Sequence, residues 1–241
     1  MEDRGGTEDN YNNNNHLKMI LRDFVQEIEI RPTRIRRGNG VCFTNPEFQF
    51  LIDDQMVAYS LEDSSCLWRF MCFCCYPFEA KIVDAENSKD ELMTVVRPFV
   101  PFPIDTCKSH CHQTSSFSSG GEEFGKISED YFYCVPTFTV TDANDQAVYK
   151  IHPPTCCGGL CVNCFTEGNP CCRKGCCKFP CHVFPADQEE THGDAPYIGK
   201  ISKRSKSMTA NAHSLTISFP DNSTSVEKGL LMGSALFLNA L

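Results

Sequence analysis

The sequence predicts a mainly β protein, folded as one closed antiparallel barrel around a single apolar C-terminal helix. Three patterns lead to this prediction: paired apolar runs on either side of acidic turns, a duplicated strand motif, and an almost uncharged final segment. The chain has 241 residues, of which 41% are hydrophobic, so it can bury the core of one large β domain.

The N-terminal part is predicted to lie outside this barrel. Residues 1–16 are polar and include an asparagine run, so we expect a disordered tail. Residues 17–40 are expected to form a short amphipathic helix and a linker, because apolar side chains up to residue 30 recur at helical spacing. These are Leu17, Ile20, Leu21, Phe24 and Ile28. A helix packed on its own domain is one interpretation, and a membrane-surface helix is the alternative.

Three segments in the region 41–241 have the pattern of a β-hairpin. Residues 41–63 place apolar runs on either side of Asp53 and Asp54. Residues 78–96 and 138–151 repeat the pattern around further aspartates. Asp and Asn favour tight turns because their side chains bond the local backbone. We therefore interpret these acidic residues as turn formers and not as metal ligands.

A short motif occurs twice and indicates a duplicated β-meander. FGKIS at residues 124–128 returns as IGKIS at residues 198–202. Each copy is followed by an alternating strand that ends in an aspartate, Asp142 or Asp221. Two such halves can close into one barrel, which leaves no exposed sheet edge. The sequence therefore predicts one barrel domain over residues 41–241.

The final segment, residues 226–241, is predicted to be a helix buried in the core. Only 13 residues lie from Gly229 to Leu241, whereas about 20 are needed to span a bilayer as a helix. A helix that is apolar on all sides is typical of a protein interior. A truncated membrane anchor is the alternative interpretation.

Several motifs occur in an order that is shared with a known family. In chain order they are TNPEFQFLIDDQMVAYSLED, CFCCYPF, KIVDA, VVRPF, GKIS, PTFTVTDAN, a cysteine cluster, IGKISK, TISFP and LLMGSALFLNAL. Together they resemble the phospholipid scramblase family over roughly residues 41–241. The resemblance implies a tubby-like β-barrel around a central helix. It also implies ATP-independent, bidirectional movement of phospholipids at the cytoplasmic face of membranes, the plasma membrane first, with calcium as activator.

The expected partners are membrane phospholipids. Family members often carry a long proline-rich arm, which the short asparagine-rich tail here does not provide, so we expect no SH3 or WW partners. The chain has 22 basic and 31 acidic residues, a net charge of −9, whereas nucleic-acid binders usually have a basic surface, so we expect no nucleic-acid partner. The sequence contains no G-x-S-x-G, P-loop or H-E-x-x-H motif, so we expect no hydrolase or NTPase.

The 17 cysteines suggest metal binding. The opening MEDRGGTEDN has no apolar signal region, so reduced thiols are expected. A cysteine-rich insertion over residues 156–181 contains a Cys-x2-Cys pair at zinc spacing, and a subset of its thiolates could form a tetrahedral Zn²⁺ site. The candidates are Cys156, Cys157, Cys161, Cys164, Cys171, Cys172, Cys176, Cys177 and Cys181.

Acylation is the second interpretation of the cysteines. The resemblance implies a palmitoylated cluster just after the strand that contains the Arg-Pro pair, where this chain has Cys107 and Cys111. Cys72, Cys74 and Cys75, which lie among phenylalanines, are further candidates. Free loop thiols without a ligand or a fatty chain remain the third interpretation.

The resemblance also implies a calcium loop, which falls on residues 211–222. Its first, third and twelfth positions are Asn211, His213 and Asn222. Calcium prefers charged oxygen ligands, and a histidine nitrogen is a poor ligand for it. We therefore expect a plain β-strand and turn here, and no calcium dependence from this loop.

A segment that overlaps the second copy of the repeated motif resembles a nuclear-import signal of some scramblases. It begins with Gly199, Lys200, Ile201, Ser202 and Lys203 and continues with further basic residues up to Lys206. A solvated strand end is the alternative interpretation. These features together give a second hypothesis for the whole chain, a zinc-binding tubby-like interaction module that moves no lipid and is partly nuclear.

Overall fold

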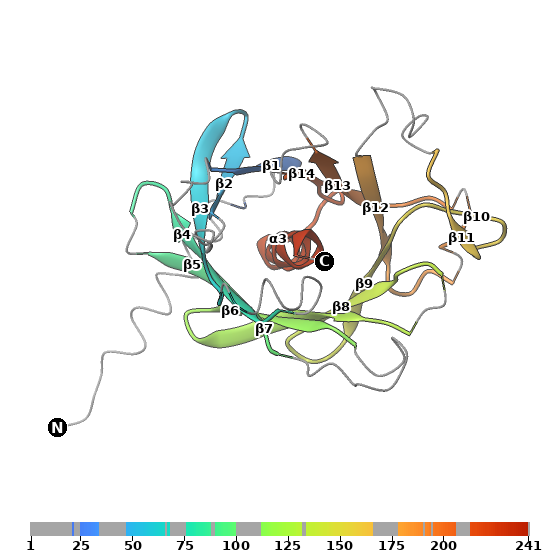
Figure 1. Cartoon of the computed structure of the whole chain (residues 1–241), viewed down its shortest axis with the longest axis horizontal. Coiled ribbons are helices and arrows are strands. Elements are labelled where there is room, and N and C mark those ends of the chain that lie inside the picture. The colour runs from blue at the N-terminus through green and yellow to red at the C-terminus, as the bar shows by residue number, and fades with distance from the viewer. Residues whose placement is uncertain are drawn as a thin grey trace.

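The computed structural model shows a closed β-barrel with one helix along its centre (Figure 1). It describes residues 21, 25–33, 47–65, 67, 76–87, 90–99, 112–131, 134–165, 178–189, 191–193, 195–205 and 213–240. The mainly β fold, the barrel and the C-terminal helix that the sequence predicts are all confirmed.

The first strands are β1 (Glu27–Pro32), β2 (Glu47–Ile52), β3 (Gln55–Asp63), β4 (Phe78–Asp84), β5 (Glu91–Arg97), β6 (Thr114–Ser119) and β7 (Glu122–Glu129). They are followed by β8 (Phe138–Asp142), β9 (Ala147–His152), β10 (Thr155–Cys156), β11 (Cys161–Val162), β12 (Lys178–Pro185), β13 (Gly199–Ser205), β14 (His213–Ser218) and the helix α3 (Ser225–Asn239). Within the described part of the chain, twelve strands form the barrel in the order β1-β14-β13-β12-β9-β8-β7-β6-β5-β4-β3-β2, and β10 and β11 form a separate two-stranded sheet.

Every pairing in the barrel is antiparallel, and β1 closes it. This strand lies between β2 and β14, with Ile28 opposite Ile217. The helix predicted over residues 17–30 is therefore wrong for residues 27–30, and the barrel begins earlier than residue 41. Ile28 and Ile30 are both fully buried and Glu29 between them is not, which is the alternation of a strand. Residues 17–20 and 22–24 lie outside the described residues.

The three predicted hairpins are present as β2–β3, β4–β5 and β8–β9. Asp53 and Asp54 form a two-residue loop and have φ angles of 50° and 61°, as expected where a tight hairpin turn needs left-handed backbone. The Asp142 carboxylate accepts hydrogen bonds from the backbone N–H of Asn144 at 2.8 Å and of Gln146 at 2.9 Å. These bonds, with the one from Gln146 first, lower the pKa of Asp142. Both sets of aspartates act as turn formers.

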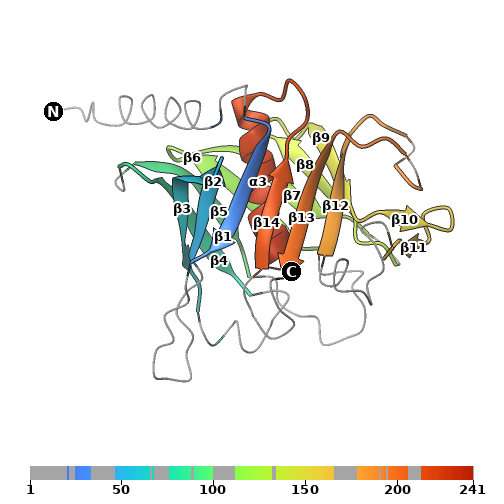
Figure 2. The same ribbon diagram turned by 90° about the horizontal axis from the view of Figure 1, so that it is seen from above.

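The helix α3 lies inside the barrel, as Figures 1 and 2 show. Leu231, Ala235 and Phe237 have no exposed surface. The helix begins with a capping box, in which the Thr224 hydroxyl accepts from the backbone N–H of Glu227 and the Glu227 carboxylate accepts from that of Thr224. No described helix is both long enough and apolar enough to cross a membrane.

Two glycines let the helix approach the wall closely. A Cβ added at Gly233 of α3 would lie 2.6 Å from the Phe117 ring of β6. A Cβ at Gly125 of β7 would lie 2.4 Å from Leu230 Cδ2 and 2.4 Å from the carbonyl oxygen of Thr141. Side chains thus fill the interior, and there is no room for one more methyl group on this side of the helix.

Candidate functional site

Two cationic side chains of the barrel wall, one buried and one partly buried, lie near the helix inside the barrel. Arg97, at the end of β5, is only 1% exposed, and its Nε donates to the carbonyl oxygen of Tyr76 at 2.9 Å. Its guanidinium carbon lies 4.9 Å from the Tyr76 ring centroid, 5.2 Å from that of Phe78 and 6.0 Å from that of Phe237. Aromatic faces attract cations, so these rings help to hold a charge in an otherwise apolar interior.

The partly buried Lys203 contacts the C-terminal end of the helix. Its Nζ donates to the carbonyl oxygen of Asn239 at 3.2 Å. The last turn of α3 has no basic residue of its own, and the carbonyl groups at a helix end carry partial negative charge. Lys203, a residue of the barrel wall, therefore provides a positive charge that stabilises the C-terminal end of the helix. Burial lowers the pKa of Lys203.

Cys181 lies beside Lys203 in the barrel wall and not with the other described cysteines. It sits on β12 opposite Ile201 of β13 and packs against the hydrophobic core. Burial of the thiol raises the pKa of Cys181 to about 12, although the nearby Lys203 acts in the opposite direction. Metal binding and acylation both need a thiolate, so this position is poorly suited to either.

The structure places four zinc candidates together on the hairpin that β10 and β11 form. Cys156 lies opposite Cys161, while Cys157 and Cys164 lie in the turn and just after β11. Partial desolvation, followed by the neighbouring thiols, raises the pKa of Cys156. Among the described residues, no three His, Cys, Asp or Glu side chains lie in an arrangement that could hold a metal ion.

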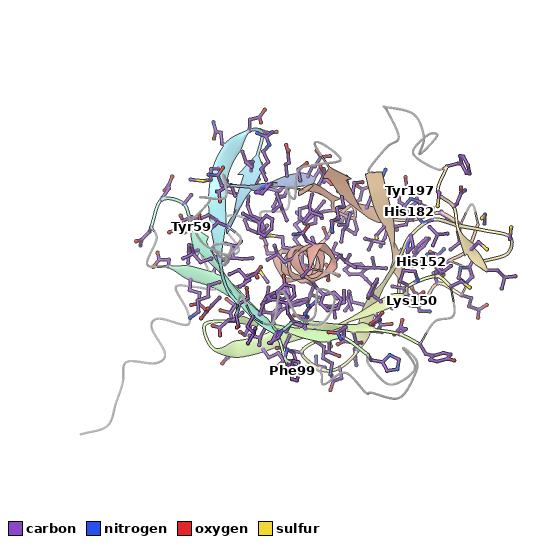
Figure 3. The ribbon with its side chains drawn as sticks, in the orientation of Figure 1. Tyr59, Phe99, Lys150, His152, His182 and Tyr197 are labelled. Carbon is purple, nitrogen blue, oxygen red and sulfur yellow. The ribbon has the colours of Figure 1, made fainter. Side chains whose placement is uncertain are left out.

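Histidine and aromatic side chains pack on the outer face of β9 and β12, between the barrel and this hairpin (Figure 3). The His152 ring stacks on the Phe184 ring with a centroid-to-centroid distance of 4.7 Å, and its centroid lies 5.5 Å from that of the His192 ring. His182 stacks on Tyr197 at 3.9 Å. Burial is the main cause that lowers the pKa of His152. We call these five residues the outer cluster.

The import-like motif and part of the calcium-loop segment are barrel strands. Gly199 to Lys203 belong to β13, and Ile201 is 2% exposed. His213 begins β14, which pairs with β1 on one side and β13 on the other. Asn222 lies in the turn before α3 with a φ of 60°.

The remaining candidates lie outside the described residues. These are Cys72, Cys74, Cys75, Cys107, Cys111, Cys171, Cys172, Cys176, Cys177 and Asn211.

Comparison with known proteins identifies the family of this barrel. The family model described as Scramblase matches residues 49–240, which include most of β2, the barrel strands that follow it and the whole of α3. The chain belongs to the scramblase family. No solved structure matches the chain.

Curated relatives of the scramblase family are similar at modest identity. Phospholipid scramblase 1 of Mus musculus is 25% identical over 194 residues, which cover 77% of this chain and 50% of that protein. The protein of the same name from Rattus norvegicus is 25% identical over 194 residues, 77% of this chain and 49% of its own. The one from Homo sapiens is 28% identical over 115 residues, 44% of this chain and 34% of its own. The chain thus spans about half the length or less of the curated relatives it matches.

Sequence reasoning missed the residues that connect this scramblase-family barrel to its helix and to the hairpin. Arg97 stands in the motif VVRPF, and nothing local indicates that its guanidinium lies buried among aromatic rings. Lys203 looks like part of a basic surface run, yet its amino group reaches Asn239. Alternation in β13 could have given a signal, because Lys203 lies two residues after the buried Ile201 and so shares its inward face.

Proposed function

We propose that this chain moves phospholipids between the two leaflets of a membrane, in both directions and without ATP. The observation that carries the proposal is the Scramblase family match over residues 49–240, which spans nearly the whole barrel together with the helix inside it. The proposed site of action is the cytoplasmic face of membranes, with the plasma membrane as the first expectation, and the partners are membrane phospholipids.

The filled interior supports a particular form of this proposal. A headgroup that crosses hydrocarbon loses its hydrogen bonds to water, and this loss is the barrier that a scramblase has to lower. The side chains of α3 occupy the space within the barrel, and an added methyl group at Gly125 or Gly233 would clash with its neighbours. The lipid route therefore runs over outer surfaces of the protein and not along the barrel axis. No catalytic side chain is needed for such a role.

Reconstitution of the whole chain into vesicles tests the proposal. Vesicles with a trace of fluorescent lipid are treated with dithionite, which reduces only the outer leaflet. Active protein should take quenching well beyond about half of the signal, without ATP. The Leu236→Asp variant, which loses the packed core, serves as the inactive control. Quenching that stays at the one-leaflet plateau with the wild-type chain, under every metal condition tried, would refute intrinsic activity.

We propose further that the segment 211–222 confers no calcium dependence. The support is that residues 213–218 are hydrogen-bonded as a strand to neighbours on both sides, so wrapping them around an ion would open the barrel. Calcium requires six to eight oxygen ligands. Asn222→Ala should leave any calcium response of the vesicle assay unchanged, and a lost response would contradict this proposal.

A zinc-binding interaction module, partly nuclear and without lipid transport, is the second candidate function. The observation that favours it is the presence of three exposed thiols, Cys157, Cys161 and Cys164, on one hairpin, although the described side chains alone do not form a metal-binding arrangement. Native mass spectrometry with and without a chelator distinguishes the two. One zinc per chain, together with no lipid movement, would favour this candidate. An apo mass in both samples would count against it.

A further inference from the structure

The hairpin of β10 and β11 exposes apolar side chains in an uncharged stretch of sequence. Leu160 in its turn is 70% exposed, and Phe165 just after β11 is 67% exposed. No charged residue or histidine occurs from Pro153 to Thr166, the longest such run in the chain. Both side chains belong to this one charge-free stretch, and exposed apolar side chains on a projecting segment can mark an interaction surface.

The backbone of the turn holds these side chains away from the barrel. Cys157, Gly158 and Gly159 all have positive φ angles, 53°, 66° and 88°, which turn the chain sharply before Leu160. The hairpin projects sideways from the wall next to β9 and β12 (Figure 2). The backbone N–H of Asn163 donates to the Pro154 carbonyl at 2.7 Å and closes the base of the hairpin.

The outer cluster braces the hairpin against the barrel. The backbone N–H of Gly193 donates to the Thr155 hydroxyl at 2.9 Å. A Cβ added at Gly159 would lie 2.7 Å from the His192 ring, so this ring packs directly on the turn. His192 in turn contacts His152, which is 1% exposed and stacked on Phe184. These contacts hold the hairpin against the barrel, which reduces the conformational entropy that it would lose on binding.

We propose that the turn of this hairpin with Leu160, which we call the membrane-contact tip, enters the interface of a phospholipid bilayer with neutral headgroups, and that the exposed Phe165 beyond the base of the hairpin adds to the contact. A lipid surface fits because the tip is apolar and carries no charge with which to pair a charged partner. Neutral lipid fits better than anionic lipid, because the chain has a net charge of −9. The inference rests on the proposed function, since it names the surface by which the protein meets its lipid substrate.

The magnitude of the effect follows from the burial of two side chains. Moving an exposed Leu or Phe out of water is favourable enough to change a partition coefficient roughly tenfold to a hundredfold. Replacing Leu160 by aspartate should therefore reduce the vesicle-bound fraction at limiting lipid by about tenfold or more. The matched control is Leu61→Asp on β3, where an exposed leucine (44%) lies across the barrel from the hairpin (Figure 1).

A tryptophan probe in the whole chain gives the direct test. The one native tryptophan, Trp68, is replaced by phenylalanine, and tryptophan is introduced by Leu160→Trp or, as control, by Leu61→Trp. Vesicles of phosphatidylcholine brominated on its acyl chains are then added. We expect a blue shift and quenching for the probe at 160 and neither for the probe at 61. Both variants are first compared with wild type by circular dichroism and thermal melting.

Defined outcomes overturn the inference. It fails if the wild-type chain does not bind these vesicles, if the probe at 160 stays unquenched on bound protein, or if Leu160→Asp binds like wild type. It also fails if binding needs anionic lipid or an added protein partner. Lipid exchange is measured on the same samples. Exchange without quenching would reject the contact tip but keep the proposed function, and quenching without exchange would reject the proposed function but keep the tip.

Discussion

The two copies of the repeated motif have the same place in the fold and different roles at one position. In both β7 and β13 the glycine and the isoleucine face the interior, as Gly125 and Ile127 and as Gly199 and Ile201. The next inward position is Glu129 in the first copy and Lys203 in the second. Lys203 contacts the end of α3, whereas Glu129 accepts at 3.3 Å from the backbone N–H of Gln113.

This difference shows which parts of a duplicated strand the fold constrains. Glycine and isoleucine are kept where a strand must pass close to its neighbours and still fill the core. The third inward residue is near the end of the barrel and can differ between the copies. There the second copy provides a positive charge for the C-terminal end of the helix. The helix breaks the symmetry of the two halves, because it has only one such end.

The largest expected effect comes from disrupting the helix that both copies face. Leu236 is 5% exposed within α3, so Leu236→Asp would bury an unpaired carboxylate. The cost is several kcal/mol, about the whole stability of a domain, and the protein should be unfolded by circular dichroism and urea titration. Val226→Asp is the control, because Val226 lies in the first turn and is 44% exposed. A folded Leu236→Asp variant that is merely released from membranes would favour the anchor interpretation.

The next largest loss of stability is expected from substitution of Gly125 and Gly199, which occupy equivalent positions in the two copies. An added methyl group at Gly125 would lie 2.4 Å from a backbone oxygen and 2.4 Å from Leu230, whereas at Gly199 it would lie 2.9 Å from the Ser218 oxygen and 3.2 Å from Pro220. We expect Gly125→Ala to lower the free energy of unfolding by about 3 kcal/mol and Gly199→Ala by about 1 kcal/mol. Urea denaturation of the two variants measures both. Equal losses of unfolding free energy would mean that α3 packs no more tightly against the first copy than against the second.

A smaller effect is a pH dependence that arises from β12, the strand paired with the second copy. The pKa of Cys181, opposite Ile201, is raised to about 12 from an ordinary value of 9.0. Between these values the unfolded chain loses the thiol proton and the folded protein keeps it, so stability falls as pH rises. From pH 8 to pH 10 the fall attributable to this group is about 1.4 kcal/mol.

Cys181→Ala should remove this part of the alkaline loss. The measurement is urea denaturation of wild type and variant at both pH values, with the exposed Cys134→Ala as control. The lowered pKa of Lys203 has the opposite effect on stability. The folded protein releases the Lys203 proton at lower pH than the unfolded chain does, so this group makes the protein more stable as pH rises. Lys203 is present in both proteins, so its contribution largely cancels. Parallel pH profiles of wild type and Cys181→Ala would contradict the prediction.

The smallest effect tests the position at which the copies diverge. Lys203→Met keeps the aliphatic part of the side chain and removes the donor to Asn239, so it should cost about 1 kcal/mol. Glu129→Met at the equivalent place should cost less, since only the longer bond to Gln113 is lost. Thermal melting of the two variants, corrected for any change in the unfolding enthalpy, ranks them. A larger loss for Glu129→Met would reverse the comparison.

Local chemistry made much of the barrel predictable from the sequence. Turn aspartates identify the hairpins β2–β3, β4–β5 and β8–β9, the repeat identifies β7 and β13, and uncharged residues identify α3. The strand β1 was not recognised because its partners, β2 and β14, lie far from each other in the sequence. Its first apolar residue, Ile28, also fits the helical spacing of the residues before it, so the sequence pattern is compatible with both a helix and a strand here.

The candidate sites were less predictable, because they depend on which face each side chain occupies. Spacing alone grouped Cys181 with the other cysteines of residues 156–181, but its strand turns the thiol toward the core. The exposure of Leu160 depends on backbone angles in the turn and on a brace from His192, which is distant in sequence. Composition could have hinted at this hairpin, since its charge-free run is longer than that of α3.

The closure of the barrel by β1 and β14 also constrains how the protein reaches its native state. Of the described strands the first pairs with the last, so the contact order is high and the ring cannot close until β14 has left the ribosome. Until then β1 and β13 each present an open edge, and the cavity that α3 will fill is empty. A nascent chain in this state is prone to pair with other chains, and it should depend on chaperones until β14 and α3 have been released.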